Sequence, residues 1–265
     1  MKHIGIIGHG AIASYFVRNL GTETGFSIKW VICRPGRESS ASLLMGESAK
    51  VFNKLEADVM QADLFLDCAG HGGLLQHGAN ILESGIDLVS VSSGALADVQ
   101  LCKNLRNAAE KGGGQLFLVS GAIGALDALS SAQTGGLKHV IYKGRKPPLG
   151  WKDSPAEKIL DLEILKAPEI HFKGNARDAA LQYPKNANVA ASVALAGLGF
   201  EDTQVELIAD PGITTNIHEI EAKGIFGSFT FQISGNALPD NPKSSALTAM
   251  SMVRAVHNRS TAIKI

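Results

Sequence analysis

The chain opens with Met1-Lys-His-Ile-Gly-Ile-Ile-Gly-His-Gly-Ala-Ile-Ala13, and this stretch decides its fold. An apolar run typical of a buried strand leads directly into Gly8-x-Gly10-x-x-Ala13, and a helical pattern follows. In that context Gly8 permits a tight turn, Gly10 lets a pyrophosphate approach the backbone, and Ala13 lets helix pack closely on strand. The N–H groups of the first helical turn, which contains Ala11 and Ile12, favour an anion. The sequence therefore predicts a dinucleotide site at Gly8, Gly10, Ala11 and Ile12, with an ordinary glycine loop as the alternative.

The end of the second predicted strand, over residues 26–33, bears on which dinucleotide is bound. An acidic residue at this place would hold the ribose 2′-hydroxyl of NAD, but the sequence continues Cys33-Arg34-Pro35-Gly36-Arg37. Two arginines here can accept a 2′-phosphate through charge-assisted hydrogen bonds. We therefore expect Arg34 to bind the cofactor and NADP to be used as well as NAD, or instead of it. Solvated loop cations are the alternative interpretation.

The composition excludes several classes of protein. Lys plus Arg and Asp plus Glu number 25 each, so the zero net charge gives no reason to expect a nucleic-acid or membrane partner. No apolar run approaches the roughly 18 residues of a membrane span, and no signal-peptide pattern precedes the first strand. The cysteines at 33, 68 and 102 form no CxxC, so we expect neither a disulfide framework nor a metal site. These features are typical of a cytoplasmic protein.

Strand and helix patterns alternate through residues 1–119. Strands are predicted at 62–69, 87–91 and 115–119, with helices at 74–82 and 98–110 between them. Such alternation predicts parallel βαβ units. The expected fold class is therefore α/β, with an N-terminal Rossmann-type, doubly wound parallel sheet that binds the dinucleotide.

The pattern changes after residue 119, and residues 120–238 are expected to form a second, α+β domain for substrate binding and dimerisation. A helix is predicted to about residue 134, and two more over 175–199, where Pro184 breaks the pattern. A last helix over 243–258 is expected to pack back on the first domain as part of segment 239–265. The strands of the second domain are predicted at 139–142, 161–166, 204–210, 215–222 and 228–233.

A histidine, His218, lies in the middle of the predicted strand 215–222. Ile217 and Ile220 do not share one parity, so periodicity leaves the face that His218 occupies open. A lone strand histidine is commonly structural, and a catalytic role is the alternative. Asn186 and Asn188 stand where a helix begins and are interpreted as N-cap residues.

Four stretches, taken together and in this order, resemble the L-aspartate dehydrogenase family. They are Gly8-His-Gly10-Ala-Ile-Ala13, Gly121-Ala-Ile-Gly-Ala-Leu-Asp127, Tyr183-Pro-Lys-Asn-Ala-Asn-Val-Ala190 and Asn216-Ile-His218. The resemblance implies oxidation of L-aspartate by NAD or NADP to iminosuccinate, which yields oxaloacetate and ammonia or supplies NAD biosynthesis. It also implies a homodimer, cofactor contacts at Ala122 and Asn188, and His218 as the active-site histidine.

The chemistry of that reaction assigns roles to residue types. Hydride leaves the α-carbon of aspartate only when the amine is neutral, so a proton acceptor is needed, and a histidine is suitable. The two substrate carboxylates need cationic or N–H partners, for which Lys185, Thr214, Thr215 and Asn216 are candidates. Dihydrodipicolinate reductase and homoserine dehydrogenase share the expected two-domain plan and remain alternatives, as does a regulator that binds NAD or NADP without turnover.

Overall fold

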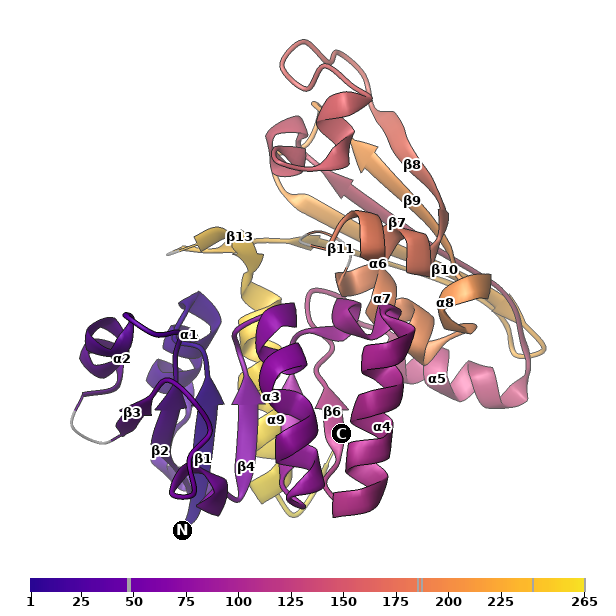
Figure 1. Cartoon of the computed structure of the whole chain (residues 1–265). Coiled ribbons are helices and arrows are strands. Elements are labelled where there is room, and N and C mark those ends of the chain that lie inside the picture. The colour runs from indigo at the N-terminus through magenta and orange to yellow at the C-terminus, as the bar shows by residue number, and fades with distance from the viewer. Residues whose placement is uncertain (47–48, 185, 187, 240, 265) are drawn as a thin grey trace. The chain divides into compact units, whose positions relative to one another are not determined.

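The computed structural model describes residues 1–46, 49–184, 186, 188–239 and 241–264. The chain divides into two compact units, coloured mainly indigo to magenta and magenta to orange in Figure 1. One unit comprises Met1–Val119 and Thr248–Ile265, and the other comprises Ser120–Leu247. Within the described ranges, no helix combines the length and the apolar character that a bilayer crossing requires.

The first unit is built on a six-stranded sheet. Its strand order is β3-β2-β1-β4-β5-β6, and every neighbouring pair is parallel. This is the doubly wound order of a Rossmann fold, so the predicted fold class is confirmed. The strands are β1 (Lys2–Ile7), β2 (Phe26–Ile32), β3 (Lys50–Phe52), β4 (Leu64–Asp67), β5 (Asp87–Ser90) and β6 (Leu116–Leu118).

Helices and short 3-10 turns connect and cover this sheet. A parallel sheet must be covered on both faces, which explains why the last four residues of β1 are all buried. Met252 and Val256 from the last helix are fully buried in the same core as Ile4 and Phe16. The elements are α1 (Ala11–Asn19), η1 (Thr22–Thr24), α2 (Glu38–Met45), η3 (Val59–Gln61), α3 (His71–Glu83), η4 (Ser93–Ala97), α4 (Val99–Gly112) and α9 (Ala246–Ser260).

The second unit has a mixed five-stranded sheet in the order β11-β10-β7-β9-β8. The pair β7–β9 is parallel, and the other three pairs are antiparallel. A small β12–β13 ribbon follows and leads into α9. The strands are β7 (Leu137–Lys146), β8 (Glu169–Asn175), β9 (Gln204–Ala209), β10 (Asn216–Gly224), β11 (Gly227–Gly235), β12 (Ala237–Leu238) and β13 (Asn241–Ser245).

The helices of the second unit lie against one face of its sheet, as Figure 1 shows. Alternate residues of β10 are buried on that face, namely His218, Ile220 and Ala222, while the residues between them are only partly buried. The helical elements are α5 (Leu126–Gly135), η5 (Pro148–Trp151), η6 (Pro155–Lys158), α6 (Ala176–Gln182), α7 (Asn188–Ala196) and α8 (Gly199–Asp202). The predicted break between two helices at Pro184 is confirmed.

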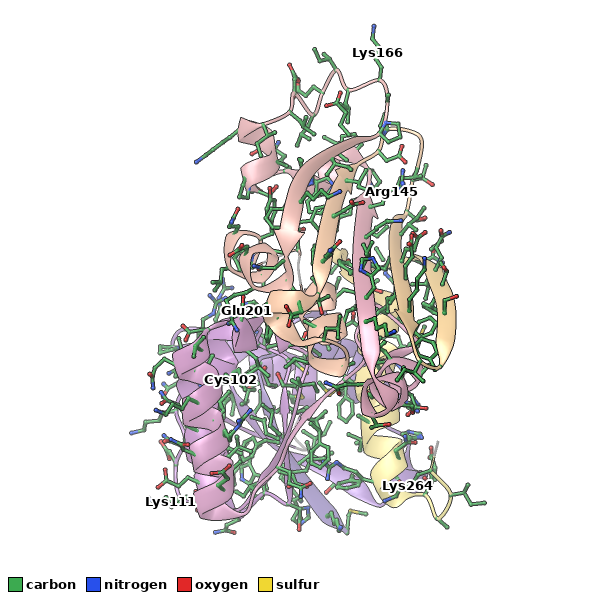
Figure 2. All side chains as sticks on the ribbon, turned by 90° about the vertical axis from the view of Figure 1, so that its right-hand side faces the viewer. Cys102, Lys111, Arg145, Lys166, Glu201 and Lys264 are labelled. Atoms are coloured by element: carbon green, nitrogen blue, oxygen red, sulfur yellow. The ribbon has the colours of Figure 1, made fainter. Side chains whose placement is uncertain are left out.

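The prediction of a strand over residues 161–166 is wrong. Asp161 Oδ1 accepts a hydrogen bond from the Glu163 backbone N–H at 3.2 Å, which closes a local turn. Ile164 is 69% exposed, so the apolar residues of this segment do not form a core-facing row, and Lys166 points into solvent (Figure 2). The strand of this region is β8, which begins only at Glu169.

Candidate active site

Gly8 follows β1 and makes the turn toward α1. Its φ of +89° lies in the left-handed region, and a Cβ there would come 2.9 Å from the Ala69 Cα. The Gly8 N–H donates to the Ile32 carbonyl at 2.8 Å, so the turn is held against β2. Both observations require glycine at this position.

Gly10 is the N-cap residue of α1, and a Cβ on it would meet no atom within 4 Å. The absent side chain therefore leaves open space in front of the helix N-terminus. Ala11 and Ile12 form the first turn, where backbone N–H groups have no partner within the helix, and Ala13 is fully buried against the core. Open space and unpaired donors at a helix N-terminus are what a pyrophosphate requires.

A cleft of about 610 Å³ lies in front of this turn. Arg34 and Arg37, both exposed, are among the residues that line it. Burial and then the charges of Arg37 and Arg34 lower the pKa of His9, whose Nε2 lies 2.9 Å from the Ser40 hydroxyl. The two guanidinium groups thus make one positive edge of the cleft. The shape, donors and charge fit a nicotinamide dinucleotide. The lining residues include Gly8, His9, Gly10, Cys33, Arg34, Arg37, Asn53, Ala69, Gly73 and Gln76.

Asp67 fixes the loops at the carboxyl end of this sheet. Its buried carboxylate accepts hydrogen bonds from the Ser90 and Ser92 hydroxyls at 2.6 and 2.7 Å and from the Ala69 N–H at 3.0 Å. Burial raises the pKa of Asp67, and the two serine hydroxyls oppose that rise. This network joins the loops after β4 and β5, and no sequence pattern predicted it.

His218 lies on β10, directly opposite Gly144 of β7, and is only 4% exposed. Its Nδ1 is 2.8 Å from the Tyr142 hydroxyl, and the two rings are stacked with an interplanar angle of 18°. A Cβ at Gly144 would lie 2.7 Å from that hydroxyl, so glycine leaves the room that the hydrogen bond occupies.

Burial, together with the charge of Lys146, lowers the pKa of His218 from 6.5 to about 4. The ring is therefore neutral at physiological pH, and burial keeps the Tyr142 hydroxyl protonated by raising its pKa. Among the residues that the structure describes, His218 Nε2 has no hydrogen-bond partner. If Nδ1–H donates to Tyr142 Oη, the Nε2 lone pair is available to accept a proton.

The other expected cofactor residues of the second unit lie before or at the beginning of helices. Ala122 is buried in the turn before α5, next to Gly121, whose φ is +69°. Ala125 ends this turn with φ +58°, a conformation that non-glycine residues adopt rarely. Asn188 is the first residue of α7.

The residues expected to bind the substrate carboxylates differ in burial and in their position relative to His218. Asn216 begins β10 two residues before His218, and this spacing puts both on the same face of the sheet. Thr215 is partly buried, whereas Thr214 is exposed. Lys185 lies outside the described residues. Tyr142 and Lys146 were not predicted as site residues, although their separation of four residues on one strand puts both on the His218 face.

Comparison with known proteins agrees with both units. Residues 8–119 match the model of the homoserine dehydrogenase NAD-binding domain, and residues 127–259 match the model of the aspartate dehydrogenase C-terminal domain. Fold and site thus define a two-domain oxidoreductase that uses NAD or NADP. The chain is 52% identical to the L-aspartate dehydrogenase of Ruegeria pomeroyi over 98% of its own length and 94% of the relative's. It belongs to the L-aspartate dehydrogenase family, as the four sequence stretches indicated.

Other relatives agree with this assignment. The L-aspartate dehydrogenase of Pseudomonas aeruginosa is 43% identical over the full length of both chains. The crystal structure of aspartate dehydrogenase from Thermotoga maritima has the same fold, with a TM-score of 0.78, 24% identity and coverage of 100% of this chain and 99% of that one. An archaeal homoserine dehydrogenase and a dihydrodipicolinate reductase from Paenisporosarcina share the fold less closely, with TM-scores of 0.57 and 0.56. These two are 12% and 16% identical, so the likeness concerns the fold alone.

Proposed function

We propose that this protein oxidises L-aspartate to iminosuccinate with NAD⁺ or NADP⁺, and that iminosuccinate then hydrolyses to oxaloacetate and ammonia or supplies NAD biosynthesis. The observation that carries the proposal is the identity to L-aspartate dehydrogenases over nearly the full length, 52% to that of Ruegeria pomeroyi and 43% to that of Pseudomonas aeruginosa. The buried, neutral His218 agrees with it, because an amino-acid oxidation needs a proton acceptor.

In this proposal His218 Nε2 accepts the proton that the substrate ammonium must lose before oxidation. Tyr142 Oη receives a hydrogen bond from Nδ1–H, which fixes the ring and stabilises the imidazolium that forms. A bound cofactor would supply the hydride acceptor for the α-carbon of aspartate. Loss of the hydride from the neutral amine leaves iminosuccinate in its protonated, iminium form, so the products are this iminium, the reduced cofactor and one proton, which His218 returns to solvent.

Gly8, Gly10, Ala11 and Ile12 are proposed to bind the pyrophosphate, because the turn has no side chain in front of the helix N-terminus. Arg34 is proposed to contact the 2′-phosphate when the cofactor is NADP. Ala122 and Asn188 are proposed cofactor contacts on the strength of the family resemblance. These proposed cofactor contacts take no part in the proton transfer by His218.

A substrate screen tests the proposed function. The purified protein is assayed with NAD⁺ and NADP⁺ against L-aspartate, D-aspartate, L-glutamate and L-homoserine, with absorbance of the reduced cofactor as the readout. The highest kcat/KM is expected for L-aspartate. Equal or higher values for L-glutamate or L-homoserine would refute the proposal, and lack of turnover with all four would favour a regulator.

We also propose that the protein is a homodimer in the cytoplasm. The dimer rests on the family resemblance alone, and light scattering coupled to size exclusion tests it. The cytoplasmic location is supported by three free thiols, Cys33, Cys68 and Cys102, which are typical of a reducing compartment. Fractionation of the source cells would test this location.

A further inference from the structure

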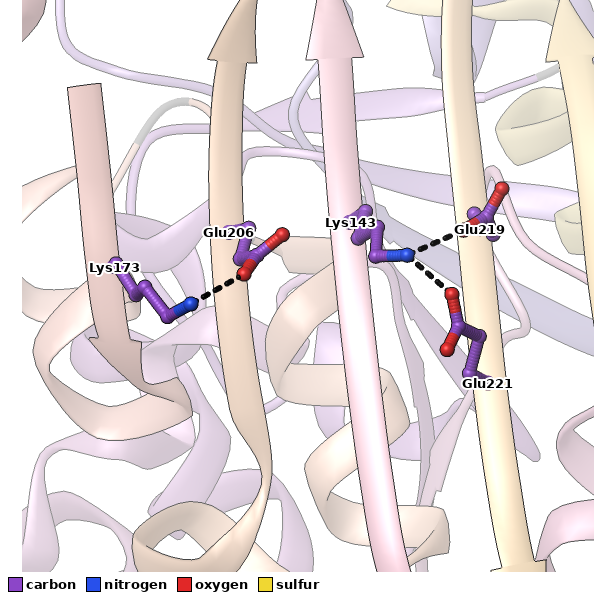
Figure 3. Close-up of polar contacts among 5 residues, drawn as sticks. All are labelled: Lys143, Lys173, Glu206, Glu219 and Glu221. Atoms are coloured by element: carbon purple, nitrogen blue, oxygen red, sulfur yellow. Dashed lines mark hydrogen bonds and ion pairs between the residues drawn. The ribbon is translucent and has the colours of Figure 1, made fainter. Parts of the chain in front are cut away.

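Three cations on the open face of the second unit's sheet, Lys143, Arg145 and Lys173, each have a carboxylate partner. Lys143 bonds Glu219 at 3.0 Å and also Glu221, and Lys173 bonds Glu206 at 2.9 Å (Figure 3). Arg145 on the same face bonds Asp210 at 2.7 Å. Each of these three charges is therefore balanced by a carboxylate of the protein.

Lys146, the last residue of β7, differs from these cations. Strand alternation puts it with Tyr142 and Gly144 on the helix-covered face that holds His218. Its Nζ donates to Asn186 Oδ1 at 2.6 Å and lies 4.9 Å from the centre of the Trp151 ring. In the part of the chain that the structure describes, no carboxylate pairs with Lys146. An ammonium has three donors, so the amide leaves two of them unused.

The two buried histidines that the Lys146 charge affects are neutral, and one of them lacks a hydrogen-bond partner. The Lys146 charge contributes, after burial, to lowering the pKa of both His218 and His171 to about 4, so neither histidine adds charge at neutral pH. His171 is 6% exposed, and its Nε2 has no hydrogen-bond partner among the described residues. Buried polar atoms in folded proteins nearly always have partners, so this unpartnered nitrogen indicates a site that a polar ligand completes.

We propose that Lys146 binds one of the two carboxylates of the substrate and so makes the enzyme specific for a dicarboxylic amino acid. This inference rests on the proposed oxidation of L-aspartate. Asn186 and Trp151 hold the ammonium in place, and the substrate carboxylate is the counter-charge that the protein does not provide. The carboxylate also offsets the positive charge that Lys146 exerts on His218, which makes that ring a better proton acceptor once substrate has bound.

The test compares Lys146→Met, Lys146→Arg and, as a control, Lys143→Met. Methionine keeps the apolar stem over Trp151 but removes the charge, and Lys143 is a cation of the same strand on the opposite face. Succinate, a dicarboxylate without the amine, is titrated by calorimetry into each full-length protein saturated with NAD⁺. NAD⁺ affinity and the melting temperature Tm are measured beside it, to establish that each variant is folded and binds the cofactor.

We expect Lys146→Met to weaken succinate binding and to raise the KM for L-aspartate by roughly 30-fold or more, the usual effect of removing one member of a buried charge pair. Lys146→Arg should retain part of the affinity, and Lys143→Met should match the unaltered protein. Unchanged succinate affinity and KM in a folded Lys146→Met protein would overturn the assignment. Because the unaltered protein still oxidises L-aspartate in that event, the proposed function would stand.

Two amides identify the carboxylate that Lys146 binds. L-Asparagine lacks the β-carboxylate and L-aspartic acid 1-amide lacks the α-carboxylate. If Lys146 binds the β-carboxylate, Lys146→Met should change kcat/KM for L-asparagine much less than for L-aspartate. If it binds the α-carboxylate, the 1-amide should be the insensitive substrate. Equal losses for all three substrates would contradict carboxylate binding by Lys146.

Discussion

The Tyr142 hydroxyl is predicted to position His218 and to stabilise its protonated form, and Tyr142→Phe removes that one oxygen. The hydrogen bond is 2.8 Å long, and both side chains are less than 5% exposed. A neutral hydrogen bond contributes about 0.5–1.5 kcal/mol and one to a charged group about 1.5–3 kcal/mol. Only the difference of about 1–2 kcal/mol, gained as the imidazolium forms, lowers the barrier, so kcat should fall roughly 5- to 30-fold.

The assay measures kcat and KM for L-aspartate, NAD⁺ affinity and Tm. Ser27→Ala is the control, because the Ser27 hydroxyl lies 3.0 Å from His3 Nδ1 in a hydroxyl–histidine pair of the first unit that belongs to neither proposed site. Both variants should melt at a lower temperature, but only Tyr142→Phe should lose turnover with unchanged NAD⁺ affinity. Equal kcat in the two variants would refute a positioning role for Tyr142.

Three further outcomes are expected. Gly144→Ala, whose new Cβ would lie 2.7 Å from Tyr142 Oη, should displace that hydroxyl and lower kcat about as much as Tyr142→Phe does, whereas normal kcat would show that the bond survives. Replacing Arg34 and Arg37 together by Ala should raise the KM for NADP⁺ about tenfold more than that for NAD⁺, and an unchanged ratio would leave both as solvated cations. His171 and His218 have a pKa near 4 when folded and 6.5 when unfolded, so the unfolded chain binds more protons between these values. The contribution of the two neutral histidines to the free energy of unfolding is therefore complete above pH 6.5 and is lost as pH falls, by up to about 2 kcal/mol each between pH 7.5 and 5. Urea titrations at both pH values measure this loss. Equal free energies of unfolding at the two pH values would contradict it.

Much of the first unit could be predicted because its strands are short, continuous apolar runs and its turns contain glycines at positions where a side chain would clash. Gly8 is the clearest case, since its φ of +89° and its approach to Ala69 exclude a side chain. The helix α2 and the strand β3 were not predicted. β3 has three residues, none of them buried, so it produces no apolar pattern.

The second unit shows where periodicity is insufficient. The Asp161–Lys166 segment has the residues of a strand, but the Asp161 turn and the exposed Ile164 show that tertiary context decides. The face of His218 remained open until its neighbours on β7 were known, because cross-strand register is not encoded locally. For the same reason Tyr142 and Lys146 could not be assigned, because they are 76 and 72 residues from His218 in sequence and share its face of the sheet only through the pairing of β7 with β10.

The most direct test of the account is the kcat of His218→Ala with L-aspartate at saturating cofactor. General acid–base assistance contributes about 10²–10⁴-fold, so kcat should fall at least about 100-fold while NADH binds as before. A structural histidine would instead contribute roughly 1–3 kcal/mol of stability through its bond to Tyr142 and nothing specific to turnover. A His218→Ala protein that melts early and still oxidises L-aspartate at a near-normal rate would contradict the central claim.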